Sequence, residues 1–204
     1  MTDAILDPER LPRLPVGPTA RRGLGWWGVW CLVATEGALF AYLLFSYFYF
    51  AVQFDKGWLP NGEVPSMRLA LPDTIVLILS SVALVFGDRG VRRGRRGENL
   101  AGIGAAFILG VIFVVVQYFE WSAKNFSART DSYGSLYFTV TGFHMAHVVA
   151  GLGVLATVFI WSLLGYFSPR RSAPVLIASV YWHFVDVVWL FVFATFYLSP
   201  YLMW

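Results

Sequence analysis

Cysteine, histidine and charged residues are scarce in this chain of 204 residues. It has one cysteine, three histidines and 13% charged residues, whereas charged residues make up about a quarter of soluble proteins. The single cysteine, Cys31, cannot form an intrachain disulfide and leaves no cysteine pair for copper or an iron-sulfur cluster. Three histidines are too few for a centre of haems and copper, whose ligands are mainly imidazoles. We therefore expect no metal, no redox cofactor and no catalytic residue in this chain.

Hydrophobic residues dominate the rest of the sequence. They make up 58% of it, and aromatic residues alone make up 18%. Five segments are apolar over about the 20 residues that a helix needs to cross the hydrocarbon core of a bilayer. They cover residues 26–52, 72–87, 100–121, 135–164 and 174–202, and only the second is marginal in length. The sequence thus predicts an all-α membrane protein, a bundle of five transmembrane helices over residues 26–204 with consecutive helices antiparallel.

The segment before the first span, residues 1–25, holds four prolines and four arginines without apolar periodicity. We expect it to be a cytoplasmic tail of the mature protein, because the apolar run after it is too long for a signal peptide. The basic residues predict the orientation of the spans. Eleven of the fifteen lie in the tail, after the second span or after the fourth, against four on the other side. The N-terminus is therefore expected in the cytoplasm and the C-terminus outside.

The longest polar stretch, residues 87–99, contains five arginines. We interpret it as a loop that sets the topology, with contact to lipid headgroups or a partner as the alternative. The basic residues flank apolar segments and the net charge is only +3, so the charge pattern indicates no nucleic-acid partner.

A few ionisable side chains lie inside the apolar segments, where an unpaired charge is costly. Glu36 stands about ten residues into the first span, roughly 15 Å along the helix axis and near the middle of the bilayer. We expect it to be protonated or hydrogen-bonded. It is either an acid that exchanges protons with water or a static hydrogen bond between helices.

Two histidines, His144 and His147, share one face of the fourth span, and Glu120 of the third span is the nearest acid. A cluster of this kind binds a metal, carries protons or holds two helices together, and we favour the last. Glu120 is shallower in the membrane than the histidines, so this contact requires a tilted or longer third helix.

The last span carries His183 and Asp186 on one face, with Trp182 and Trp189 along the same stripe. We interpret the stripe as a packing surface rather than a cofactor site. Asp186 needs a partner within the membrane, and it pairs either with His183 or with another chain.

These residues belong to motifs that resemble those of cytochrome c oxidase subunit III. The most specific motif is YWHFVDVVWL at residues 181–190. Four further segments follow the family's order: WCLVATEGALF at 30–40, LSS at 79–81, QYFEW at 117–121 and FHMAHV at 143–148. The resemblance covers nearly all of residues 26–204, and the five spans match the short bacterial form of the family.

The resemblance implies an accessory, non-redox subunit of a haem-copper oxidase in the bacterial inner membrane. It implies docking on subunit I near its proton-uptake entrance, beside subunit II and other oxidase subunits, with haem and copper in those partners. It also implies that Glu36 lines a cleft that holds membrane phospholipids, and that the subunit sustains proton supply and protects the enzyme from turnover inactivation.

Other functions remain open at this stage. Subunit III of ubiquinol oxidases and an accessory protein of nitric oxide reductase share the fold and several of the motifs. A small transporter or proton channel would instead gather its intramembrane acids along one water-filled path. An assembly or lipid-binding protein would have no part in turnover.

Overall fold

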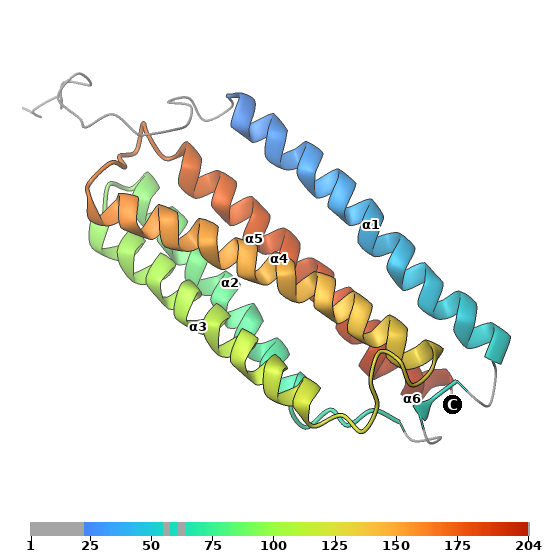
Figure 1. Cartoon of the computed structure of the whole chain (residues 1–204). Helices are drawn as coiled ribbons and strands as arrows, with labels where there is room; N and C mark the ends of the chain where they lie inside the picture. Colours follow the sequence, from blue (N-terminus) through green and yellow to red (C-terminus); the bar gives the residue numbers. More distant parts are fainter. Residues whose placement is uncertain (1–22, 55–57, 61–63, 204) are drawn as a thin grey trace, which may run out of the picture.

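The structure is a computed structural model that describes residues 23–54, 58–60 and 64–203 (Figure 1). No strand occurs among these residues, and five of the helices are long and apolar enough to cross a membrane. They are α1 (Leu24–Phe54), α2 (Ala70–Arg92), α3 (Arg96–Ser122), α4 (Ser132–Leu163) and α5 (Ala173–Phe193), and α5 continues through a π-helical segment η3 (Ala194–Leu198) into α6 (Ser199–Met203). The predicted all-α class and five spans are confirmed. Most of the predicted tail, residues 1–25, lies outside the described residues.

The connection between α2 and α3 is shorter than expected. α2 continues to Arg92 instead of ending near residue 87, and α3 begins at residue 96, so a single loop over residues 87–99 is wrong. Asp88 and Arg92 form an i,i+4 ion pair at 2.5 Å, and Gly94 makes the turn with a φ of 72°. Hydropathy predicts only the apolar part of a helix. α2 continues past this part because arginine is a good helix former and because Arg92 pairs with Asp88 one turn earlier.

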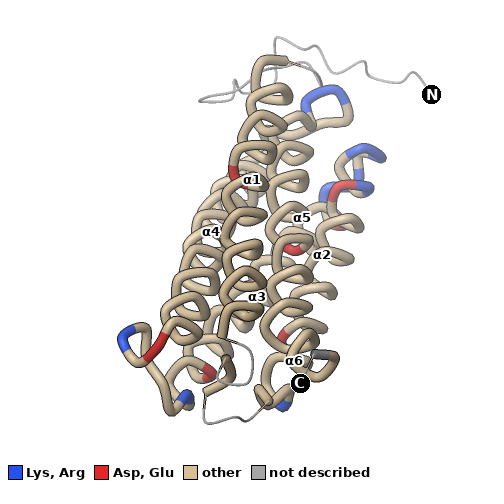
Figure 2. The backbone as a smooth tube through the Cα atoms, turned by 90° about the vertical axis from the view of Figure 1, so that its right-hand side faces the viewer, with Lys and Arg blue, Asp and Glu red and all other residues tan. Residues whose placement is uncertain are grey.

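Helices α2 to α5 form a four-helix bundle. Each packs against the next, and α5 closes the ring against α2. α1 lies along α4 and α5, on the side of the bundle away from α2 and α3 (Figure 1). Lys and Arg gather near the two ends of the helices and leave an uncharged band between them apart from a few acids (Figure 2). This distribution fits a bundle whose middle lies in hydrocarbon.

Glycines let α2 and α3 approach closely. A Cβ atom on Gly102 would lie 2.4 Å from the backbone nitrogen of Gly87, so Gly102 has no room for a side chain, and a Cβ atom on Gly87 would be tight at 3.1 Å from the backbone nitrogen of Ile103. The Asn99 amide donates to the carbonyl of Gly87 at 3.1 Å, and the Ser162 hydroxyl of α4 donates to Oδ1 of Asn99 at 2.5 Å. Small residues with buried hydrogen bonds hold membrane helices together where the hydrophobic effect between helices is absent.

The indole of Trp182 fills the centre of the bundle and is fully buried. Two glycines on neighbouring helices make room for it. A Cβ atom on Gly110 of α3 would lie 2.6 Å from the indole, and one on Gly151 of α4 would lie 3.0 Å from it. The large side chain of α5 therefore determines how closely α3 and α4 pack around it.

Candidate functional site

Glu36 of α1 and His147 of α4 are partners inside the membrane-spanning region, with 3.2 Å between Oε2 and Nε2. The other ring nitrogen of His147, Nδ1, lies 2.7 Å from the carbonyl oxygen of Phe143. A carbonyl can only accept a hydrogen bond, so Nδ1 carries a hydrogen. The contact at Nε2 then needs one further proton, held by the carboxyl or by the ring. The pair is therefore neutral as a whole and holds one proton between two groups that can each bind it.

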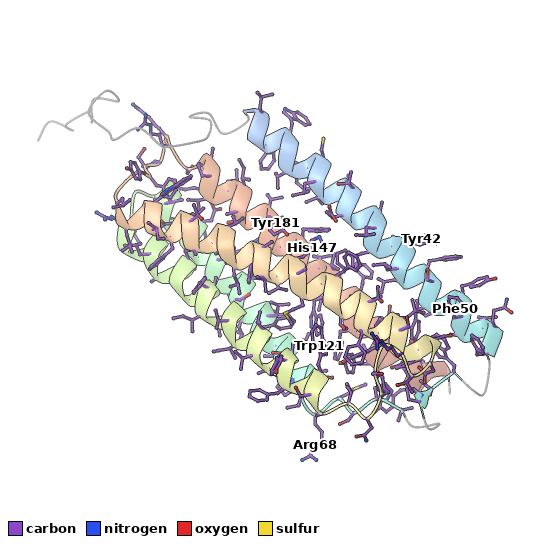
Figure 3. The ribbon with its side chains drawn as sticks, viewed as in Figure 1. Tyr42, Phe50, Arg68, Trp121, His147 and Tyr181 are labelled. Carbon is purple, nitrogen blue, oxygen red and sulfur yellow. The ribbon has the colours of Figure 1, made fainter. Side chains whose placement is uncertain are left out.

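The Glu36–His147 pair is partly open on one side. The two side chains are 28% and 16% exposed, respectively. Phe40 packs edge-on against the imidazole of His147 with 5.1 Å between ring centroids, and the hydroxyl of Tyr181 on α5 donates to the His147 carbonyl at 3.3 Å. His147 and Tyr181 lie on the side of the bundle that faces α1 (Figure 3). We call Glu36, His147 and Tyr181 the α1 site.

His144, one helical turn from His147, points into the bundle instead. It is 1% exposed and lies among the rings of Phe40, Phe113 and Trp189, with centroid distances of 6.3, 6.0 and 5.0 Å. Neither ring nitrogen has a hydrogen-bond partner among the described residues. His144 thus serves as a packing residue here, and the two histidines do not act as one group.

The structure separates Glu120 from both histidines, which corrects the expected cluster of the three. Glu120 accepts a hydrogen bond from the Tyr197 hydroxyl and lies 3.0 Å from Nζ of Lys124. The hydroxyl groups of Tyr137 and Tyr197 are 2.8 Å apart. Since α3 and α4 are antiparallel, the end of α3 lies beside the start of α4. His144 comes seven residues after Tyr137 on α4 and therefore lies about 10 Å from it along the helix axis.

The stripe on α5 makes its hydrogen bonds to α2. The indole nitrogens of Trp182 and Trp189 donate to Ser80 and Thr74, each at 2.9 Å. The hydroxyl of Ser81 donates its hydrogen to Asp186 and lies 2.8 Å from Nδ1 of His183. Because a hydroxyl group has only one hydrogen, Nδ1 of His183 is the donor in the second bond. His183 and Asp186 therefore meet through a hydroxyl of α2 rather than directly.

Sequence reasoning did not assign the partners on α2. Ser80 and Ser81 were noted only as part of a motif, and Thr74 was not singled out. The available signal was the spacing of Thr74 and Ser81, since seven residues bring two hydroxyl groups back to one helix face, as Trp182 and Trp189 are brought on α5. Four polar contacts along these two faces join α2 to α5 over about two helical turns.

The described residues contain no group of three or more His, Cys, Asp or Glu side chains that could hold a metal ion. Cys31 is a free, exposed thiol on α1. The side-chain contacts between helices described above are pairs and short hydrogen-bonded chains.

The comparisons with known proteins all identify the same family. A family model described as cytochrome c oxidase subunit III matches residues 17–201. Cytochrome c oxidase subunit 3 of Mammuthus primigenius is 31% identical over 186 residues, which cover 88% of this chain and 71% of that protein. The subunits 3 of Homo sapiens and Gallus gallus are 30% and 28% identical, with the same shares of both chains covered.

Proposed function

The chain belongs to the cytochrome c oxidase subunit III family, and from this premise we propose that it is the accessory, non-redox subunit III of a haem-copper terminal oxidase. It docks against subunit I, beside subunit II and other oxidase subunits. There it stabilises the catalytic subunit, holds phospholipid and supports proton uptake. Haem and copper belong to the partner subunits, where oxygen is reduced. Cytochrome c is the proposed electron donor, because the relatives bear that name.

The α1 site is the observation that supports a role in proton supply. Glu36 and His147 share one proton and remain neutral as a pair, which keeps uncompensated charge out of the hydrocarbon. A carboxyl group and an imidazole can each accept or release that proton. The pair is also partly exposed, so a water or a neighbouring molecule can reach it.

The outer face of α1 supports a role in holding lipid. Its exposed side chains are large and apolar or aromatic, such as Tyr42 at 69% and Phe45 at 65% exposure. Figure 3 shows Tyr42 and Phe50 on this helix, on the side turned away from the bundle's interior. We propose that acyl chains pack against these rings and cover the open edge of the α1 site.

The chain is a multi-pass membrane protein, and we propose the bacterial inner membrane as its location. The arginine-rich turns after α2 and α4 lie at the same end of the bundle, which supports a cytoplasmic position for that end. The N-terminus and residues 1–25, as a tail, are then cytoplasmic as well, and the C-terminus lies outside.

Replacement of Glu36 in the purified oxidase tests this function. Glu36→Ala is expected to leave the initial rate of oxygen consumption unchanged and to reduce the number of turnovers that the enzyme completes before it is inactivated. Thr35→Ala is the matched control, because among the described residues the Thr35 hydroxyl bonds only carbonyls of its own helix. An unchanged inactivation lifetime in Glu36→Ala would contradict the proposed role.

A further inference from the structure

Two arginine-rich turns meet at the end of the bundle opposite α6. A Cβ atom on Gly94, in the turn between α2 and α3, would lie 3.5 Å from Cγ of Pro169, in the turn between α4 and α5. The guanidinium of Arg96 donates to the carbonyl of Leu163, the last residue of α4, at 2.5 Å. Figure 2 shows basic segments gathered at this end of the bundle. The two turns therefore form one surface.

This surface has a large excess of positive charge. Residues 87–99 contain five arginines and residues 164–172 contain two, whereas the only acids in both stretches are Asp88 and Glu98. Each of these acids is already paired. Asp88 lies 2.5 Å from Arg92, and Glu98 lies 2.7 Å from Arg95. The remaining arginines are therefore available to an anion that comes from outside the chain.

Three exposed arginines of this surface, which make no ion pair within the described part of the chain, are called the arginine cluster: Arg89, Arg93 and Arg170. Arg89 and Arg93 are four residues apart and share one face of α2. Arg93 directly precedes Gly94 and Arg170 directly follows Pro169, and these two neighbours are in contact. The long side chains of Arg93 and Arg170 can therefore reach the same anion.

The face of α2 that carries Arg89 and Arg93 is apolar towards the middle of the helix. Val82 and Phe86 lie seven and three residues before Arg89, on the same helix face. They are 61% and 49% exposed. Two guanidinium groups thus follow an exposed apolar surface along one helix. A phospholipid has the same arrangement, since its acyl chains lie in the hydrocarbon and its phosphate lies at the membrane surface.

The chemistry of the cluster selects the headgroup. A guanidinium presents a planar fork of N–H donors that fits two oxygens of a phosphate group. Groups of basic residues at the end of a transmembrane helix attract lipids of negative net charge. A zwitterionic lipid brings its own positive charge close to the arginines and is bound less well. A free phosphate ion has no acyl chain and gains nothing from Val82 and Phe86.

We propose that the arginine cluster binds the headgroup of one anionic phospholipid, whose acyl chains lie along Val82 and Phe86 of α2. This site is separate from the α1 site, because α1 packs on α4 and α5, away from α2 (Figure 1). The inference goes beyond the function proposed above and requires only that the chain lies in a membrane. The bound lipid connects the turn after α2 with the turn after α4.

Lipid retention by the purified protein tests the proposal. The preparation is isolated in detergent through a tag on this chain, depleted of lipid and mixed with micelles that contain phosphatidylglycerol or phosphatidylcholine with the same acyl chains. The lipid retained after a wash is measured by mass spectrometry. We expect saturable retention of phosphatidylglycerol in several-fold excess over phosphatidylcholine, and no displacement by inorganic phosphate. Equal retention of the two lipids, or complete displacement by phosphate, would overturn the proposal.

A double substitution, Arg93→Gln with Arg170→Gln, locates the retained lipid. It is expected to lower the affinity for phosphatidylglycerol by about tenfold, because two basic residues are lost from the site. Arg68→Gln with Arg129→Gln removes the same charge at the other end of the bundle and should leave the affinity unchanged. Equal losses in the two double variants would overturn the proposal. Glu36→Ala should keep this affinity, so failure of the α1 site is distinguished from failure of the arginine cluster.

Arg93→Lys with Arg170→Lys separates a defined phosphate site from diffuse attraction. The two lysines keep the positive charge but cannot bind two phosphate oxygens through one planar fork. We expect the affinity for phosphatidylglycerol to fall several-fold, while the net charge of the chain is unchanged. An affinity equal to that of the wild type would show that charge alone holds the lipid near the membrane surface, and it would overturn the proposed site.

Discussion

The Ser81 hydroxyl on α2 accepts a hydrogen bond from Nδ1 of His183 on α5 across 2.8 Å. The same hydroxyl donates to Asp186, so a single oxygen satisfies two ionisable side chains of the last helix. Two residues of the strongest sequence motif, residues 181–190, thus contact a serine about 100 positions earlier in the chain. These contacts join α5 to α2.

Ser81→Ala should therefore weaken the joint between α2 and α5. The substitution leaves Asp186 and His183 without their shared partner in a largely buried position, and an unsatisfied buried group costs about 1–3 kcal/mol. We expect the chain to be released from the complex at a lower temperature in detergent. Ser46→Ala is the control, because within the part of the chain that the structure describes the Ser46 hydroxyl bonds only the Tyr42 carbonyl of its own helix. Equal release temperatures for the two variants would show that the joint contributes nothing.

Gly110→Ala tests how tightly the bundle closes around Trp182. The added methyl group would meet the indole at 2.6 Å and a methyl group of Leu152 at 2.8 Å, and overpacking of this kind costs about 1–3 kcal/mol. The thermal unfolding midpoint of the subunit should fall. Gly142→Ala adds the same methyl group on α4 where no heavy atom lies within 4 Å, and it should leave the midpoint unchanged or raise it. A fall of similar size in both variants would contradict the tight contact.

Glu36→Gln separates the hydrogen bond of the α1 site from its proton. The amide of glutamine still donates to Nε2 of His147, so the link between α1 and α4 is kept, while the titratable carboxyl is lost. We expect retention of this chain after a detergent wash to match the wild type, whereas Glu36→Ala should lose about 1 kcal/mol of association between the helices. If turnover lifetime falls in Glu36→Ala but not in Glu36→Gln, the site holds the helices together and does not exchange protons.

The sequence predicted the helices well and their polar contacts less well. Apolar runs revealed five spans because the bilayer demands a minimum length of each one. They could not reveal how far α2 extends, since Asp88 and Arg92 are charged and continue the helix through their ion pair.

Which intramembrane residues pair with one another could be predicted only from the arrangement of the helices in space. Glu120 was assigned to the histidines because it is near them along the chain, but the antiparallel packing of α3 and α4 places it beside Tyr137 and Tyr197. His147 finds its acid on α1, 111 positions away. Periodicity shows which residues share one helix face, and it contains no information on which face of another helix lies opposite.

The central claim, that this chain is an accessory subunit of a haem-copper oxidase, is tested most directly by purification through a tag on this chain in mild detergent. The visible spectrum and the masses of the copurifying chains are recorded together. We predict a haem spectrum that follows this chain, with oxidase subunits I and II in equal amounts and no haem or copper on the chain once it is separated. A colourless preparation that contains only copies of this chain would contradict the claim.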